Sequence, residues 1–156
     1  MSSTNCVDNP SLLSSAGEVV AFSGADQQHI CQIRETVFGQ EQNISRALDL
    51  DGEDPQAWHA LVFVDGQPVA TGRILADGHI GRVAVLKSHR GKGMGAKVVN
   101  ALAQFAQEQG YPRVFLGAQS HAVDFYHRLG FTACGDEFIE ADILHVPMHK
   151  LLHHSA

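Results

Sequence analysis

The chain has 156 residues, of which 44% are hydrophobic, and its formal net charge is −6 at pH 7. This length fits one compact domain, and the negative charge argues against a nucleic-acid partner. No apolar run is long enough to span a membrane, and the N-terminus lacks a secretory signal. Three cysteines without metal-ligand spacing favour a reducing compartment, so we expect a cytoplasmic protein.

The N-terminal third combines a polar beginning with one strand and one helix. Residues 1–16 are polar and Ser-rich, which predicts a poorly ordered tail before a single domain over residues 17–156. A short strand is expected at Val19–Phe22. Asp26 then caps a predicted helix whose apolar positions follow helical spacing: Ile30, Ile33 and Val37.

An acidic segment follows, from Phe38 to Pro55, and it is predicted as a loop with a short helix around Ile44–Leu48. Three strands come next, and two Asp-Gly turns separate them. They are expected at Trp58–Val64, Pro68–Leu75 and Ile80–Leu86. Such closely spaced strands predict an antiparallel meander.

After these strands the hydrophobic period changes to that of a helix. An apolar stripe at helical spacing predicts a helix that begins near Met94 and ends at Gly110. The remaining chain predicts, in order, strand Arg113–Gly117, helix Ser120–Leu129, and strands Phe131–Phe138 and Ile143–Leu151. This order of elements predicts a mixed α/β sheet with helices packed on it.

The positive charge of this acidic chain is concentrated in one segment. Residues 78–107 contain no Asp or Glu but hold five cations: Arg82, Lys87, Arg90, Lys92 and Lys97. A basic segment in an acidic protein indicates a local site for an anion.

A glycine-rich turn lies within that basic segment, between a buried strand and the start of a helix. Glycines let the backbone approach a ligand, and the first N–H groups of a helix have no partner within it. A pyrophosphate could therefore bind there. The predicted binding residues of the turn are Arg90, Gly91, Lys92, Gly93, Met94, Gly95 and Ala96.

Two familiar nucleotide-binding patterns fit this turn poorly. The Walker pattern is absent. Gly91, Gly93 and Ala96 match the dinucleotide fingerprint, but no acidic residue ends the next strand, at Ala118-Gln119. A dinucleotide enzyme is therefore a weaker alternative.

A third pattern, Arg-x-x-Gly-x-Gly after an apolar strand, is matched by Arg90, Gly93 and Gly95. Together with the segment Asp124–Phe131 and the run His145-Val146-Pro147-Met148, it resembles the GNAT superfamily of N-acetyltransferases, in particular its ElaA-like branch. The resemblance implies an α/β (α+β) fold with a mostly antiparallel sheet of about six or seven strands and about four helices. Its central strands are expected to splay apart.

The resemblance also implies a reaction and a cosubstrate. Acetyl-CoA would occupy the gap between the splayed strands. Its pantetheine arm would run along the strand of Val83, Ala84 and Val85, with Gln119 and Phe125 as further contacts. A neutral amine would attack the thioester directly, and Tyr126 would protonate the departing thiolate. A catalytically silent acyl-CoA-binding module is the alternative from another class.

The sequence leaves the general base open. His145 belongs to the ElaA-like run, and His79 lies on the strand before the loop, on the same side as Val83 if that strand is regular. Glu41, His59 and an ordered water chain are further candidates.

The acceptor is expected to be a small-molecule amine, but its charge is left open. Arg34 and Arg73, with Glu41 nearby, border the expected acceptor pocket and could hold a carboxylate or phosphate. Alternatively, these arginines pair with Glu35 or Glu41. The acidic run Asp49–Asp54 could instead attract a cationic amine. No metal site is expected, and exposed sheet edges would allow a homodimer.

Overall fold

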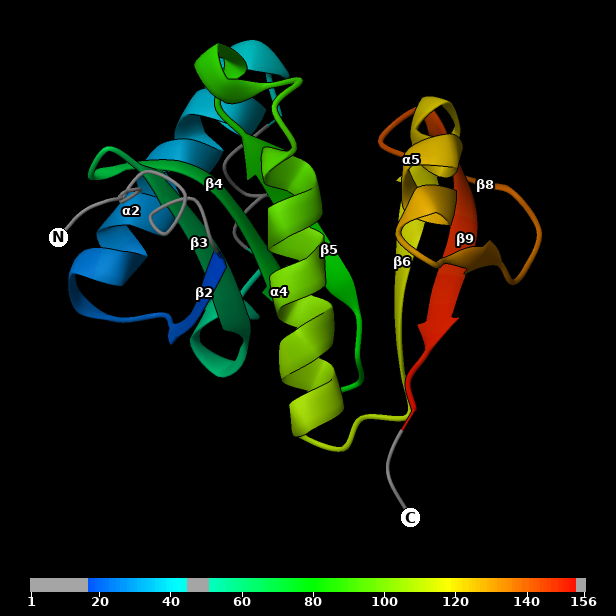
Figure 1. Cartoon of the computed structure of the whole chain (residues 1–156). Coiled ribbons are helices and arrows are strands. Elements are labelled where there is room, and N and C mark those ends of the chain that lie inside the picture. Colours follow the sequence, from blue (N-terminus) through cyan, green and yellow to red (C-terminus); the bar gives the residue numbers. More distant parts are fainter. Residues whose placement is uncertain (1–16, 45–50, 154–156) are drawn as a thin grey trace, which may run out of the picture.

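The computed structural model describes residues 17–44 and 51–153 (Figure 1). The predicted tail and residues 45–48 of the predicted short helix lie outside these ranges. The first sheet contains four antiparallel strands in the order β2-β3-β4-β5. Their bounds are β2 Gly17–Ala21, β3 Trp58–Val64, β4 Gln67–Ile74 and β5 Ile80–Val85. The predicted meander is therefore confirmed.

The second sheet is built around one long strand, β9 (Ile143–Leu151), with which three other strands pair antiparallel. These are β6 (Arg113–Gln119), β7 (Thr132–Ala133) and β8 (Phe138–Glu140). The prediction of one continuous strand from Phe131 to Phe138 is wrong. Residues 134–137 lie outside both β7 and β8, so the chain pairs with β9 in two short stretches.

The two sheets meet where β5 and β6 run side by side and then separate (Figure 1). In the described part of the chain, one parallel bridge lies at this junction, between Phe115 of β6 and His79, which immediately precedes β5. The Phe115 N–H donates to the Gly78 carbonyl over 3.0 Å. Gly78 has φ +96°, and a Cβ there would lie 2.5 Å from the Arg113 oxygen, so only glycine allows this approach. The predicted splay is confirmed.

Helices cover both faces of the first sheet. Helix α4 (Met94–Glu108) packs on one face, and α2 (Gly24–Arg34) followed by the π-helix η1 (Glu35–Glu41) packs on the other. Short helices complete the fold: η2 Asp54–Gln56, η3 Lys87–His89, η4 Ser120–Ala122 and α5 Val123–Arg128.

Two predicted helix boundaries are wrong. Ser23, not Asp26, is the N-cap residue of α2, and Asp26 lies in the first turn. The predicted loop beginning at Phe38 is helical up to Glu41, because the chain continues from α2 with wider turns. Gln42 N–H, for example, donates to the Val37 carbonyl five residues earlier.

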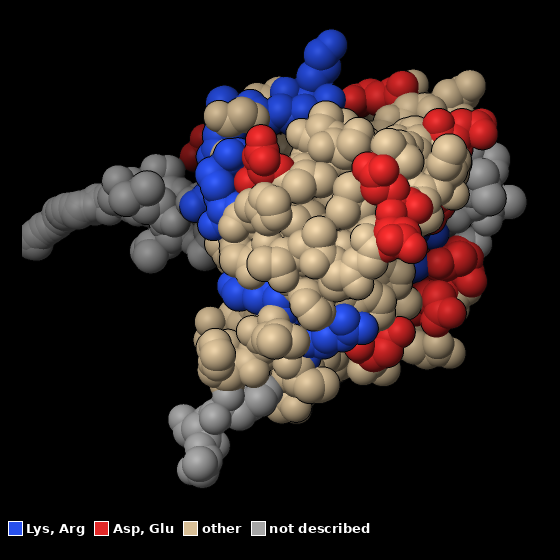
Figure 2. All heavy atoms as spheres, turned by 90° about the vertical axis from the view of Figure 1, so that its right-hand side faces the viewer, with Lys and Arg blue, Asp and Glu red and all other residues tan. Residues whose placement is uncertain are grey.

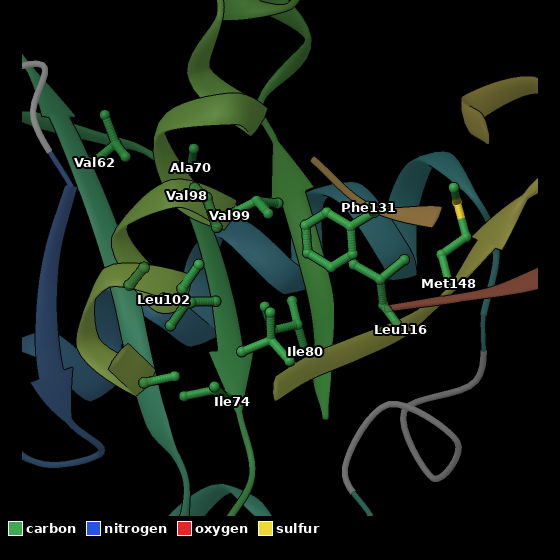
Figure 3. Packing of buried hydrophobic residues seen from close by; sticks show 14 of the residues in the cluster. Val62, Ala70, Ile74, Ile80, Val98, Val99, Leu102, Leu116, Phe131 and Met148 are labelled. Carbon is green, nitrogen blue, oxygen red and sulfur yellow. The ribbon is translucent and has the colours of Figure 1, made fainter. Parts of the chain in front are cut away.

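The larger hydrophobic core fills the space between α4, the first sheet and the second sheet. In Figure 3, Leu116 of β6, Met148 of β9 and Phe131, which precedes β7, face Ile80 of β5 and Val99 of α4. All five side chains are buried. Burial of this apolar surface holds the two sheets together although few backbone hydrogen bonds join them.

Candidate active site

The glycine-rich turn forms the floor of a cavity of about 450 Å³ at the start of α4. Gly91 and Gly93 have φ values of +76° and +83°, which side chains rarely adopt. Gly93 is the N-cap of α4, and no side chain caps the first turn. The first N–H groups of a fifteen-residue helix are therefore available to an anion, as predicted from the glycine pattern.

Residues from α5 form the opposite wall of this first cavity. We call it the phosphate cavity, after the ligand group that the glycine-rich turn is predicted to bind. Its lining consists of Val85, His89, Arg90, Gly91, Gly93, Met94, Gly95, Ala96, Phe125, Arg128 and Leu129. The structure thus brings Phe125 and most of the predicted loop residues together. Lys92 is exposed and does not line the cavity, and Ala84 is buried on the other side of β5, in the core beneath α2.

Arg90 connects the turn to two other elements. Its Nε donates to the Val85 carbonyl over 2.9 Å, and its Nη2 lies 2.6 Å from Glu41 Oε1. Glu41, at the end of η1, is thus paired with a cation. We infer that this contact holds the end of η1 against the phosphate turn, because an arginine can bond a carbonyl and a carboxylate at once.

A second cavity, of about 570 Å³, is lined by neighbouring residues of the same two elements, β5 and α5. Val85 and Phe125 line the phosphate cavity, whereas Val83 and Tyr126 line the second. Other elements contribute the rest of its wall: η1 and the residues after it, β6, and the β8–β9 hairpin. The lining is completed by Phe38, Gln42, Ile44, Ile80, Gly81, Arg82, Leu116, Gly117, Gln119, Ala122, Glu140, Ala141, Ile143 and His145.

A bulge in β5 shapes the wall of the second cavity. The register shifts between Thr71 and Arg73 of β4, so that β5 has one extra residue there. Arg82 adopts φ +52°, an unusual value for a residue with a side chain. A bulge of this kind interrupts the ladder and redirects the strand, here immediately before Val83.

Tyr126 lines the second cavity, and its neighbour Phe125 lines the first. Its ring packs against Phe125 and Phe131 with centroid distances of 5.0 and 5.8 Å. Burial raises the pKa of the Tyr126 hydroxyl above its ordinary value of 10.0. The hydroxyl therefore carries its proton at neutral pH, as a general acid must.

Of the side chains predicted as candidate bases, His145 is the one that lines the second cavity. Its Nδ1 lies 2.8 Å from the Ile143 carbonyl, which can only accept a hydrogen bond. Nδ1 therefore carries the proton in the neutral ring, and Nε2 keeps a lone pair that could accept one. The ring also stacks on Phe138 with a centroid distance of 5.4 Å.

The other histidine candidates lie elsewhere. His79 stacks on Phe115 at the junction of the sheets and does not line the second cavity, and burial lowers its pKa. His59 is 1% exposed, and its Nε2 lies 3.1 Å from the Asp54 carbonyl. Neither ring is positioned to meet an acceptor amine in the cavity.

Arg34 and Arg73 belong to a buried ion-pair network. Both contact Asp54 Oδ1, at 2.8 and 3.0 Å, and Arg73 also binds both oxygens of Asp51. Arg82 reaches Asp51 Oδ2 over 3.2 Å. These aspartates, rather than the predicted Glu35 and Glu41, are the partners that the structure shows. Arg34 and Arg73 are only 2% and 5% exposed, so their guanidinium groups serve the fold.

The network also changes the interpretation of the acidic run. The hydrogen bond from Arg73 holds the pKa of Asp51 well below its usual range. Burial would raise the pKa of Asp54, but the hydrogen bonds and charges of Arg34 and Arg73 outweigh it and lower that pKa. Asp51 and Asp54 are therefore neutralised by arginines rather than directed at a cationic amine.

Sequence reasoning missed two parts of the second cavity. The π-helix η1 presents Phe38, and Gln42 follows it, although polar composition indicated a loop. Glu140 enters from the β8–β9 hairpin, and only its position two residues from Phe138 could have signalled a shared face. Among the described residues, no three His, Cys, Asp or Glu side chains cluster as metal ligands would.

Comparison with known proteins connects this geometry to a family. The model of the acetyltransferase (GNAT) domain matches residues 24–152. The uncharacterized N-acetyltransferase YjcF of Bacillus subtilis is 36% identical over 136 residues, covering 85% of this chain and 97% of that protein. The crystal structure of Escherichia coli ElaA superposes with a TM-score of 0.76 at 27% identity, covering 86% of this chain and 97% of ElaA.

A more distant structure shares the fold. An aminoglycoside 6′-N-acetyltransferase complexed with coenzyme A has a TM-score of 0.70 at 14% identity and covers 89% of this chain and 99% of its own. Within residues 17–44 and 51–153, no helix has the length and apolarity needed to cross a membrane. The predicted family and fold are thus confirmed: the chain belongs to the GNAT acetyltransferases and is an acyltransferase enzyme.

Proposed function

We propose that this enzyme transfers the acetyl group of acetyl-CoA to a primary amine of a small molecule. The observation that carries the proposal is the order of the two cavities along β5 and α5. A ligand whose phosphates sit on the turn at Gly91 and Gly93 can extend along Val85 and Val83 to Tyr126. The acceptor would then enter the second cavity from η1 and the β8–β9 hairpin.

The residues of the phosphate cavity fit coenzyme A. A Cβ built at Gly91 or Gly93 meets nothing within 4 Å, so the turn is open to a ligand. Arg128 and Arg90 add positive charge to the N–H groups of α4. Val83 and Val85 lie at the splay, where β5 can pair with an extended arm in place of a neighbouring strand.

Acetyl-CoA supplies an activated acetyl thioester. Acetyl transfer from it to an amine requires two proton transfers. A C–N bond forms as the C–S bond breaks. We assign His145 Nε2, directly or through a water, as the group that takes the proton from the amine nitrogen. We assign the Tyr126 hydroxyl as the donor to the departing sulfur. A backbone N–H near Val83–Val85 would stabilise the thioester oxygen as negative charge develops.

A pair of variants on α4 tests the cosubstrate site. Gly95 lines the phosphate cavity with an ordinary helical backbone, so Gly95→Glu places a carboxylate there without a strained φ. We expect this variant to lose acetyl-CoA binding by calorimetry and thiol release with an amine panel. Asn100→Glu adds the same charge to an exposed position of the same helix and should keep both. Undiminished binding by Gly95→Glu would overturn the proposed site.

Two expectations from the sequence stay predictions. A homodimer rests on exposed sheet edges, and sedimentation equilibrium of the purified chain would test it. A cytoplasmic location rests on composition, and cell fractionation would test it.

A further inference from the structure

The β8–β9 hairpin contributes one carboxylate, that of Glu140, to the lining of the second cavity. Its register pairs Phe138 with His145 and Glu140 with Ile143. Because side chains alternate along a strand, these four residues share one side of the hairpin. Three of them line the second cavity, namely Glu140, Ile143 and His145. Ile139 and Leu144 point the other way and are 71% and 40% exposed.

Local contacts hold this hairpin in position over β6. Ala141 and Asp142 form its two-residue turn with φ values of +52° and +63°, the signs required by a type I′ turn. Phe138 covers Gly117 of β6, where a Cβ would lie only 2.9 Å from the Phe138 ring. These contacts fix the position of Glu140 relative to β6.

The charge around the cavity distinguishes Glu140 from the other acidic residues nearby. Asp51, Asp54 and Glu41 all face arginines at hydrogen-bond distance. Glu140 has no hydrogen bond or ion pair with any described residue, although its charge acts on His79. Among the described residues that line the second cavity it is the only carboxylate. In Figure 2, which views the molecule from the side of the second sheet, most Asp and Glu side chains gather on the right and most Lys and Arg on the left.

The rest of the cavity is mostly apolar. Phe38, Ile44, Ile80, Val83, Leu116 and Ile143 contribute hydrophobic side chains. Arg82 is the one arginine among the described lining residues, and it contacts Asp51. We therefore propose that Glu140 binds the ammonium form of the acceptor as it enters, and that the acceptor is a cationic alkylamine with an apolar body and no anionic group. This inference rests on the function proposed above.

A matched pair of acceptors and a matched pair of variants test it. Phenethylamine and phenylalanine share an apolar body and an amine, but only phenylalanine carries a carboxylate. We expect wild type to have the lower KM for phenethylamine. Glu140→Gln should raise that KM about tenfold, because the amide oxygen can still accept a hydrogen bond from the ammonium but the carboxylate charge that strengthens this bond is lost. Asp142→Asn removes a charge from the same turn with a residue that also tolerates positive φ, and should leave KM unchanged.

A neutral acceptor separates charge recognition from a structural effect. Aniline is uncharged at neutral pH, so its KM should be the same in Glu140→Gln and wild type. Equal KM values for phenethylamine in Glu140→Gln and wild type, or preference for phenylalanine, would overturn the assignment of Glu140. If the wild type acetylated none of the amines, the proposed function would be contradicted instead. Calorimetry with acetyl-CoA would show separately whether the cosubstrate binds.

Discussion

At the scale of single residues, Tyr126 shows how burial fixes the protonation state of a side chain. An exposed tyrosine also carries its proton at neutral pH, and burial raises the pKa of this hydroxyl further. The proton is therefore retained through alkaline conditions. The activity of the wild type should show no loss from deprotonation of Tyr126 below about pH 10.

Replacement of Tyr126 by phenylalanine tests the acid. We expect kcat to fall by at least about a hundredfold, because general acid catalysis typically contributes that much or more. The affinity for acetyl-CoA should change little, since the ring and its packing on Phe125 and Phe131 are kept. Steady-state thiol release and calorimetry measure the two effects. Tyr111→Phe, which lies outside both cavities, is the control. Unchanged kcat in Tyr126→Phe at every pH would remove this residue as the acid.

Arg34 and Arg73 also show that residue type alone does not reveal whether a charged side chain binds a ligand or forms an ion pair within the fold. Arg34 and Arg73 have the chemistry of anion-binding groups, yet the fold buries them against Asp51 and Asp54. Their partners are close in the fold but up to 22 residues away in the sequence. Composition alone could not have chosen these partners over Glu35 and Glu41.

At the scale of elements, the close packing of α4 on β4 fixes the position of the glycine-rich turn at the start of α4. Gly72 lies beneath Val98, and a Cβ at Gly72 would be 2.6 Å from a methyl group of that valine. Since valine has few rotamers in a helix, the helix itself would have to shift. The start of α4 bears the phosphate turn, so such a shift would reach the site.

Gly72→Ala is therefore expected to destabilise the protein by about 1–3 kcal/mol through overpacking. Val98→Ala in the same chain removes the clashing methyl groups and should restore part of the loss. Urea unfolding of the two single variants and the double variant measures the coupling. Additive changes in the free energy of unfolding would show that the side chains at positions 72 and 98 do not clash.

At the scale of the whole molecule, buried ionisable groups link stability to pH. Burial lowers the pKa of His59 below its ordinary value of 6.5, because the charged ring would lose its hydration. Its Nε2 carries a proton and donates to the Asp54 carbonyl over 3.1 Å. The folded chain therefore keeps a neutral ring while the unfolded chain binds a proton, and the free energy of unfolding falls as the pH drops below 6.5.

His59→Gln should flatten this part of the stability profile. Glutamine can still donate to the Asp54 carbonyl but does not titrate. The wild type loses at most about 1.4 kcal/mol per pH unit through this one proton. Urea unfolding at a series of pH values measures the slope, with the exposed His127→Gln as control. An identical slope in wild type and His59→Gln would contradict the prediction. Asp51 and Asp54, whose pKa values are lowered, contribute stability that is lost only below pH 3.8.

What the sequence determined by itself is local in character. The Asp-Gly turns, the alternation in residues 58–86 and the stripe from Met94 predict strands and a helix, because backbone geometry imposes these periods over a few residues. The glycine turn is readable for the same reason: positive φ and a helix start are properties of adjacent residues. The turn side of the phosphate cavity could thus be predicted, whereas His89, Arg128 and Leu129 were not.

Only the tertiary structure decided what surrounds the acceptor. The π-helix continues α2 through polar residues, and the β8–β9 hairpin carries Glu140 and His145 to the splay from the end of the chain. The same packing neutralises Asp51 and Asp54 and leaves Glu140 facing the cavity. Which charges meet depends on contacts between distant segments, and hydrophobic burial across the two sheets brings those segments together.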